Sequence, residues 1–190
     1  MLNVPVRGES ASLDLVNTTY VRGGSRGHLV DALPGPDALT EWLETEPEAR
    51  VEVGPEVDLK PGSFARVMRV RQVLRESYRQ ATDPTADLDA EMVAEINAGM
   101  RLAQTWRELE RPGSTRRVWN NDQYTDRVIA WLMRDATILL GENPLRVHAC
   151  TAPGCILYFL PSGRRKYCSQ SCATRVRVAR HHRSESGRPL

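Results

Sequence analysis

The sequence lacks the features of membrane proteins, exported proteins and several enzyme classes. No apolar run approaches the roughly 20 residues that a membrane-spanning helix needs, so we expect no membrane partner. Residues 1–7 have neither the basic start nor the apolar stretch of a secretory signal. The chain also has no Gly-x-Ser-x-Gly, His-Glu-x-x-His, dinucleotide-binding or phosphate-loop motif. We therefore expect a cytoplasmic protein that is not an enzyme.

Cysteine is absent except in one short window. All four cysteines lie within 23 of the 190 residues, as Cys150-x4-Cys155-x12-Cys168-x3-Cys172. Two close pairs separated by a short insert can present four thiolates to one tetrahedral Zn²⁺. Four thiolates close the coordination sphere, whereas a catalytic zinc keeps one position open. The spacing predicts one structural zinc ion per chain, bound by Cys150, Cys155, Cys168 and Cys172.

Alternative interpretations of the cysteines are two disulfides or four unrelated buried thiols. Disulfides require an oxidising compartment, and unrelated thiols would not fall into close pairs. His148, His181 and His182 flank the window and are candidate substitute ligands, although their spacing is longer than that of the cysteine pairs. Between the pairs, residues 156–167 are expected to form a strand, a tight turn and a basic return.

Positive charge is concentrated after residue 140. Residues 141–190 hold nine Lys and Arg and two Asp and Glu, a formal charge of +7, so that residues 1–140 carry −5 of the whole-chain +2. Residues 169–183 are expected to form a helix with Ser169 as its N-cap. Clustered cations release counterions when they meet a phosphate backbone. The candidate nucleic-acid-binding residues are Arg164, Arg165, Lys166, Arg175, Arg177, Arg180 and Arg183. A solvated basic tail is the alternative.

The rest of the chain has the composition of a globular protein and reads mainly as helices. It is 41% hydrophobic and 26% charged, which leaves room for one core of about 140 residues with a small module attached. Apolar spacing predicts helices over 37–46, 63–82, 87–98 and 122–140, and a hairpin from strands over 100–110 and 115–119. We expect residues 22–36 to form an irregular loop, Ser12 to cap a short helix and Ser63 to cap the second long one.

Arginines on the helix over 63–82 suggest a second site. Five arginines share this helix with one acidic residue, Glu76. They could form a solvated face. Alternatively, Arg71 and Arg75, which are four residues apart, turn inward to bind a small anionic ligand through their planar guanidinium groups. Asp14 and Asn17 lie three residues apart on an earlier helical turn, where they either cap the helix or orient such an arginine.

Two runs of residues resemble known families. Cys150-x4-Cys155, an aromatic strand, Gly163-Arg164-Arg165-Lys166-Tyr167-Cys168-Ser169 and Cys172 resemble the CGNR zinc finger. The run Ser12-Leu13-Asp14-Leu15-Val16-Asn17-Thr18 is similar to the motif that opens ABATE domains. One departure is that this chain has Cys172-Ala173-Thr174-Arg175 where the finger typically has Cys-Gly-Asn-Arg. The resemblance implies a transcriptional regulator with a DNA-binding, zinc-bearing C-terminal part.

These observations lead to one set of expectations. The fold is mostly α with a small β-hairpin, an α+β arrangement: a helical regulatory domain over 1–143, a finger of hairpin and helix over 144–184, and a disordered tail over 185–190. We expect DNA as the partner, with the N-terminal domain sensing a ligand or forming a homodimer. An RNA-binding or protein-interaction adaptor with a purely structural zinc site is the alternative.

Overall fold

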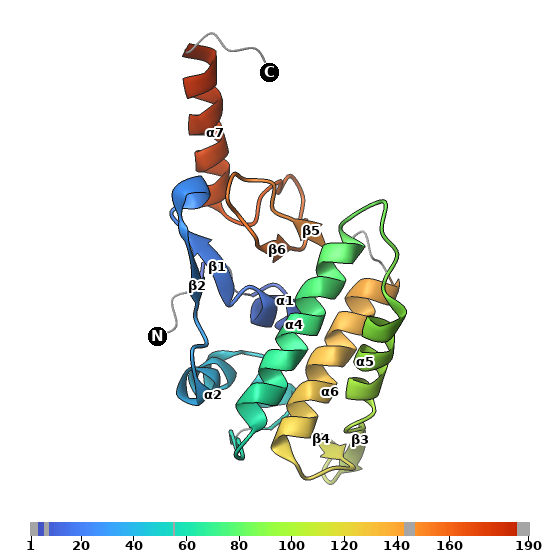
Figure 1. Cartoon of the computed structure of the whole chain (residues 1–190). Helices are drawn as coiled ribbons and strands as arrows, with labels where there is room; N and C mark the ends of the chain where they lie inside the picture. Colours follow the sequence, from blue (N-terminus) through green and yellow to red (C-terminus); the bar gives the residue numbers. More distant parts are fainter. Residues whose placement is uncertain (1–3, 6–7, 55, 143–146, 186–190) are drawn as a thin grey trace.

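Helices dominate the structure, and small β-ribbons join them. The computed structural model describes residues 4–5, 8–54, 56–142 and 147–185, with the side chains of 142 and 182–185 excepted (Figure 1). Within these ranges the strands form three separate two-stranded antiparallel ribbons. No described helix is long and apolar enough to span a bilayer. The expected α+β class with small hairpins is confirmed.

A short buried helix lies at the centre of the helical part. Helix α1 spans Ala11–Val16, and all of its residues are buried. It packs against α4 (Ser63–Ala81) and α6 (Tyr124–Thr137), and α5 (Ala90–Met100) lies beside α6 (Figure 1). Leu13 and Leu15 are fully buried within the core that these helices share. A helix of only six residues is stabilised by this burial rather than by its own propensity.

The sequence suggested that Ser12 caps α1, but this prediction is wrong. Ser10 occupies the N-cap position, and Ser12 lies inside the helix with its side chain fully buried. The Ser12 hydroxyl donates to the Asp135 carboxylate, so Tyr78 donates to Ser12 across an Oη–Oγ distance of 2.6 Å. Burial raises the pKa of Tyr78, which keeps its proton available for this bond. The serine thus joins α1 to α4 and α6.

The expected loop over 22–36 contains a hairpin. Strands β1 (Thr19–Arg22) and β2 (His28–Asp31) pair antiparallel, and the 3-10 helix η1 (Gly24–Arg26) connects them. The glycines that indicated a loop form the turn, because Gly23 and Gly24 have φ of 98° and 70°, which favour glycine. Strands of four residues are too short to show a clear alternation of apolar and polar side chains.

The longer helices and the second hairpin follow the sequence closely. Helix α2 spans Pro36–Thr45 and buries Leu39, Trp42 and Leu43; the four-residue α3 (Ala49–Glu52) follows it. Ser63 is the first residue of α4 rather than its cap; Gly62 holds the N-cap position, and the Ser63 hydroxyl contacts that of Thr125 at 2.6 Å. Asp89 caps α5. The remaining elements of this part are β3 (Thr105–Glu110), β4 (Ser114–Trp119) and the π-helical turn η2 (Ile138–Glu142), which continues α6.

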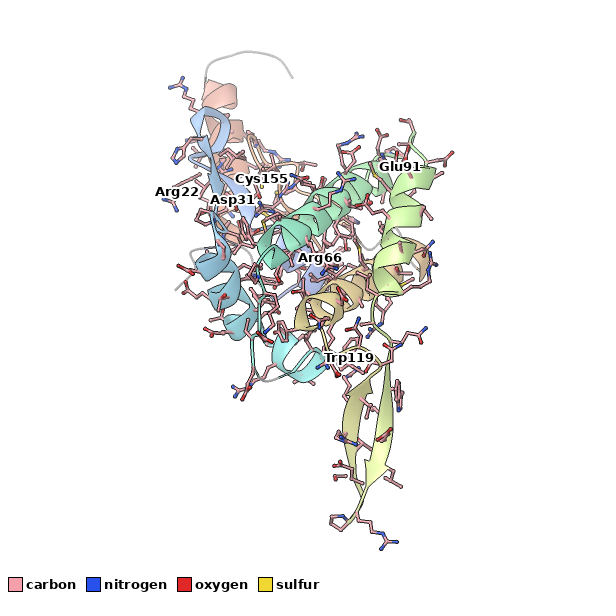
Figure 2. All side chains as sticks on the ribbon, turned by 60° about the horizontal axis from the view of Figure 1, so that its bottom comes forward. Arg22, Asp31, Arg66, Glu91, Trp119 and Cys155 are labelled. Atoms are coloured by element: carbon pink, nitrogen blue, oxygen red, sulfur yellow. The ribbon has the colours of Figure 1, made fainter. Side chains whose placement is uncertain are left out.

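The β3–β4 hairpin projects from the helical part at the end opposite α7 (Figure 1). Trp119 lies near its base (Figure 2), where the Arg134 guanidinium lies 5.5 Å from the centre of the Trp119 ring. Arg117 also pairs with Glu52 of α3 at 2.6 Å. These contacts tie the ribbon to α3 and α6.

The C-terminal part contains one ribbon and one helix. Strand β5 (His148–Ala149) pairs antiparallel with β6 (Tyr158–Phe159), and α7 spans Gln170–Glu185. The strand and the tight turn expected within residues 156–167 are present as β6 and as a turn at Gly163, whose φ is 55°. The strand does not pair with the basic return that follows the turn, because its partner is β5, which precedes the cysteine pairs. The sequence predicts a disordered tail over 185–190. Glu185 is the last residue of α7, and residues 186–190 lie outside the described part.

Candidate metal centre and basic surface

The four cysteines meet in one cluster. Their Sγ atoms all lie within 4.8 Å of one another; the Cys155–Cys168 and Cys168–Cys172 separations are 3.6 Å and 3.5 Å. Zn–S bonds of about 2.3 Å give a tetrahedron with S···S edges of about 3.8 Å. A disulfide needs about 2.05 Å, and all four thiols are free. The geometry therefore matches a four-thiolate zinc site and not the alternative of two disulfides.

Local structure explains how the four sulfurs converge. Cys150 directly follows β5, and Cys155 follows a turn at Gly154, whose φ is 72°. Cys168 precedes α7, and Cys172 lies in the first turn of that helix. Ser169 caps the helix as the sequence predicts, since its hydroxyl accepts from the Cys172 amide at 3.3 Å. The cap fixes the direction in which Cys172 points.

The close thiols shift one another's pKa values in opposite directions. Hydrogen bonds from Cys155 and then Cys168 lower the pKa of Cys150 to about 2. The hydrogen bond with Cys150 in turn raises the pKa of Cys155 to about 12, and Cys150 and Cys155 raise that of Cys168. Four ionised thiolates at this distance require a cation, and Zn²⁺ supplies that charge when it binds. The residues present therefore fit one structural zinc ion.

His148 and His181 are not part of the cluster. Among the described residues, the metal-ligating group contains cysteines only. His148 is exposed and lies edge-on to the Phe159 ring at 5.7 Å, and His181 is exposed on α7. The side chain of His182 lies outside the described residues.

Residues distant in sequence cover the metal cluster. Tyr20 of β1 packs with the cysteines and with Leu157 and Phe159, and the ring of Phe159 is almost completely buried. The hydrophobic core of the helical part also extends into the C-terminal part, because it includes Val147 and Tyr158. The metal module is thus built onto the helical part through shared apolar packing. Neither Tyr20 nor this packing was predicted from the sequence.

Comparison with protein families gives two matches. Residues 9–143 match the family model of ABATE, described as "Putative stress-induced transcription regulator", and residues 146–184 match that of the CGNR zinc finger. The chain belongs to the ABATE family. A comparison with curated proteins gave no match. Below, residues 9–143 are called the ABATE region and residues 146–184 the CGNR finger.

Polar contacts add to the packing between the ABATE region and the CGNR finger. Asn17 donates to the Tyr158 carbonyl at 2.9 Å and accepts from the Tyr158 amide at 3.0 Å. The Arg75 guanidinium reaches the carbonyl of Ile156 at 3.2 Å and those of Val16 and Thr19. Burial lowers the pKa of Arg75. Three backbone oxygens thus accept hydrogen bonds from this half-buried cation.

The other residues of the suggested ligand pocket are also engaged within the protein. Asp14 accepts from the amides of Gly8 and Glu9 at 2.6 Å and 3.2 Å. Arg71 forms a two-pronged pair with Asp31, with N–O distances of 2.7 Å and 2.6 Å. Burial alone would raise the pKa of Asp31, but Arg71 and the Leu33 amide lower it. Asp14, Asn17, Arg71 and Arg75 each have hydrogen-bond partners within the protein, and a small anionic ligand there stays a prediction.

The cations of the CGNR finger fall into two groups. Arg164, Lys166, Arg177 and Arg180 are exposed. Arg164 and Lys166 line a groove of about 430 Å³ beside the first turn of α7. Helix α7 itself projects away from the ABATE region (Figure 1). The side chain of Arg183 lies outside the described residues. Arg164 and Lys166 lie on the turn before Cys168, and Arg177 and Arg180 lie on α7, which contains Cys172. The metal cluster therefore joins the two segments that carry the exposed cations.

Arg165 and Arg175 instead turn toward the protein. Arg165 pairs with Glu9 at 2.5 Å, lies 5.0 Å from the Phe159 ring centre and donates to the Tyr167 and Cys168 carbonyls. Arg175 is half-buried and donates to the Pro153 carbonyl at 3.2 Å. Sequence reasoning could count these charges but not assign these contacts, because their acceptors lie on distant or irregular segments.

Proposed function

We propose that this protein is a DNA-binding transcription regulator whose zinc-braced finger presents a basic surface to the phosphate backbone. The observation that carries the proposal is the group of exposed cations, Arg164, Lys166, Arg177 and Arg180, on elements that converge on the cysteine cluster. The ABATE family description supports the regulatory part of the proposal. Zinc fixes the turn and the helix relative to each other, so the cations keep their spacing.

Helix α7 has a suitable shape for this role. Its 16 residues correspond to about 24 Å at 1.5 Å per residue, and the B-DNA major groove admits an α-helix. The helix projects from the body rather than lying across it (Figure 1). In this proposal Arg177 and Arg180 contact phosphates or guanine edges, while Arg164 and Lys166 contact phosphates. Arg183 follows Arg180 by three residues on α7, and in this proposal it extends the same surface.

The remaining parts of the proposal concern organisation. Residues 1–143 form the regulatory domain, which senses a ligand or dimerises, and residues 144–184 form the DNA-binding domain. The contacts of Asn17 and Arg75 with the finger provide a direct route for such regulation. Four free thiols suit a reducing compartment, so we place the protein in the cytoplasm. Four thiolates leave no open zinc position, so we assign no enzymatic role.

A salt titration tests the proposed function. Zinc-loaded protein is titrated into fluorescently labelled duplex DNA of random sequence at several salt concentrations. Each phosphate contact contributes about 0.9 to the slope of log affinity against log salt concentration, so four contacts give a slope of about −3.6. Single-stranded RNA and heparin serve as competitors. Flat salt dependence contradicts the proposal, and stronger competition by RNA than by duplex DNA favours the RNA-binding alternative.

A further inference from the structure

A narrow groove separates the ABATE region from the CGNR finger. It lies between β1 and the first turns of α7 and has a volume of about 220 Å³. This is below the roughly 300–1,000 Å³ of pockets that enclose drug-sized ligands, so it suits a small group. Its polar lining comes from Arg22, Ser169, Ser171 and Arg175, with Tyr20 on the wall of the ABATE region.

The chemistry of this groove suits an anion. Arg22 belongs to the ABATE region and Arg175 to the finger. No Asp or Glu lines the groove; its two cysteines, Cys155 and Cys172, are ligands of the metal cluster, where Zn²⁺ offsets thiolate charge. Each guanidinium has five N–H donors. Arg22 donates to the Tyr20 hydroxyl at 2.9 Å, and Arg175 donates to the Pro153 carbonyl at 3.2 Å. Both arginines therefore have further N–H groups to offer, and arginine's planar fork matches phosphate oxygens.

Two glycines bring the walls of the groove together. A Cβ on Gly154 would lie 2.4 Å from the backbone of Gly24, and a Cβ on Gly24 would lie 3.0 Å from Nε of Arg175. Only glycine permits this approach of the η1 turn to the finger. Figures 1 and 2 both show the β1–β2 hairpin beside the base of α7. The position of Arg22 relative to Arg175 is thus fixed by backbone packing.

The surroundings extend the positive surface. Arg26 on η1 is exposed near the hairpin turn, and Arg177 is exposed on α7. Arg22 itself is exposed on the hairpin (Figure 2). Arg175 was expected from sequence to meet nucleic acid, whereas nothing in the sequence singled out Arg22.

We propose that this groove binds a backbone phosphodiester of nucleic acid between Arg22 and Arg175. The inference rests on the proposed function and deepens it, because it makes the ABATE region a direct part of the nucleic-acid interface. The Ser169 and Ser171 hydroxyls lie 2.9 Å apart and share one hydrogen bond, which leaves one hydroxyl proton of the pair to donate to the same phosphate. The β1–β2 hairpin then fixes the position of the ABATE region on the duplex, so that a movement of the hairpin relative to the finger changes the affinity for DNA.

The test compares Arg22→Gln with Arg111→Gln in the full-length, zinc-loaded chain. Arg111 is exposed in the turn of the β3–β4 hairpin, far from α7 (Figure 1). We expect Arg22→Gln to reduce the magnitude of the salt slope for duplex DNA by about 0.9 and to weaken binding about tenfold at low salt, with Arg111→Gln unchanged. Equal zinc content and equal thermal unfolding establish that both variants are folded.

Three other outcomes are distinguishable. Salt-dependent DNA binding by the wild-type protein with no change in Arg22→Gln overturns the inference and leaves the proposed function standing. Absence of duplex binding by the wild-type protein overturns both. A parallel calorimetric titration with inorganic phosphate identifies the source of the anion: phosphate binding that Arg22→Gln abolishes, without any change in the DNA slope, assigns the groove to free phosphate and overturns its role on nucleic acid.

Discussion

Asn17 and Tyr158 exchange two hydrogen bonds across 141 residues of sequence. The Asn17 side chain accepts from the Tyr158 amide and donates to its carbonyl, at 3.0 Å and 2.9 Å. The carboxamide therefore satisfies both backbone groups of a residue in β6, as a neighbouring strand would. Asn17 is fully buried and Tyr158 nearly so, which makes this contact a fixed joint between α1 and the CGNR finger.

Replacing Asn17 with alanine should loosen that joint. The variant leaves a buried amide and a buried carbonyl without their partner, and each such group costs about 1–3 kcal/mol. We expect the free energy of unfolding to fall by roughly 2–6 kcal/mol, measured by urea denaturation. Asn17→Gln, which keeps the carboxamide but moves it by one methylene, is the control for chemistry against position. A loss below about 0.5 kcal/mol would show that the joint does not matter.

A pair of glycines separates backbone strain from steric contact. Gly154 and Gly163 both have positive φ, of 72° and 55°. A Cβ on Gly154 would clash with the backbone of Gly24, whereas a Cβ on Gly163 would have no atom within 4 Å. Gly163→Ala should cost about 1 kcal/mol and retain zinc. Gly154→Ala should cost clearly more and increase the protease sensitivity of the β1–β2 hairpin. Equal losses in urea denaturation would contradict the close packing of the hairpin on the finger.

Asp31 should make stability depend on pH. Its pKa is lowered in the fold, so its stabilising pair with Arg71 is present at neutral pH and is lost as the pH falls below the usual carboxyl range. Because the Asp31 side chain is 40% exposed, we expect Asp31→Asn to cost only about 1 kcal/mol at pH 7. The difference from the wild-type protein should vanish near pH 2. Asp122→Asn, at a 99% exposed side chain, should change stability little at either pH, and a constant Asp31→Asn deficit would refute the linkage.

The neighbouring residues Arg164 and Arg165 should have different roles. Arg164 is exposed, whereas Arg165 pairs with Glu9 at 2.5 Å and lies over Phe159. Arg164→Gln should reduce the magnitude of the DNA salt slope by about 0.9 without changing the urea midpoint. Arg165→Gln should lower the urea midpoint. The assignment fails if the two substitutions have the same effects on binding and stability.

Local patterns in the sequence predicted much of the fold. Helical spacing located α2, α4, α5 and α6, and the cysteine pairs located the metal cluster, because both signals depend on residues close in sequence. The β1–β2 hairpin was missed because its strands have four residues each and its turn contains the glycines that indicated a loop. Ser12 was taken for a cap because its partners, Tyr78 and Asp135, lie on other helices.

The candidate site was only partly predictable. The spacing identified Cys150 to Cys172 as ligands, and the charge count identified the basic surface. Neither could show that Arg165 and Arg175 face the protein, or that Arg75 is satisfied by carbonyl oxygens. Such contacts depend on how the ABATE region packs against the finger, and a single sequence carries no local signal for that packing.

Zinc dependence of DNA binding tests the central claim most directly. Affinity for duplex DNA is measured on the wild-type protein, after removal of zinc by a chelator and after its return, with Cys168→Ser in parallel. We predict one zinc per wild-type chain, loss of salt-sensitive binding on removal and recovery on return, while Cys168→Ser neither retains zinc nor recovers. DNA binding that is unchanged without zinc would contradict the claim that the metal holds the basic surface in place.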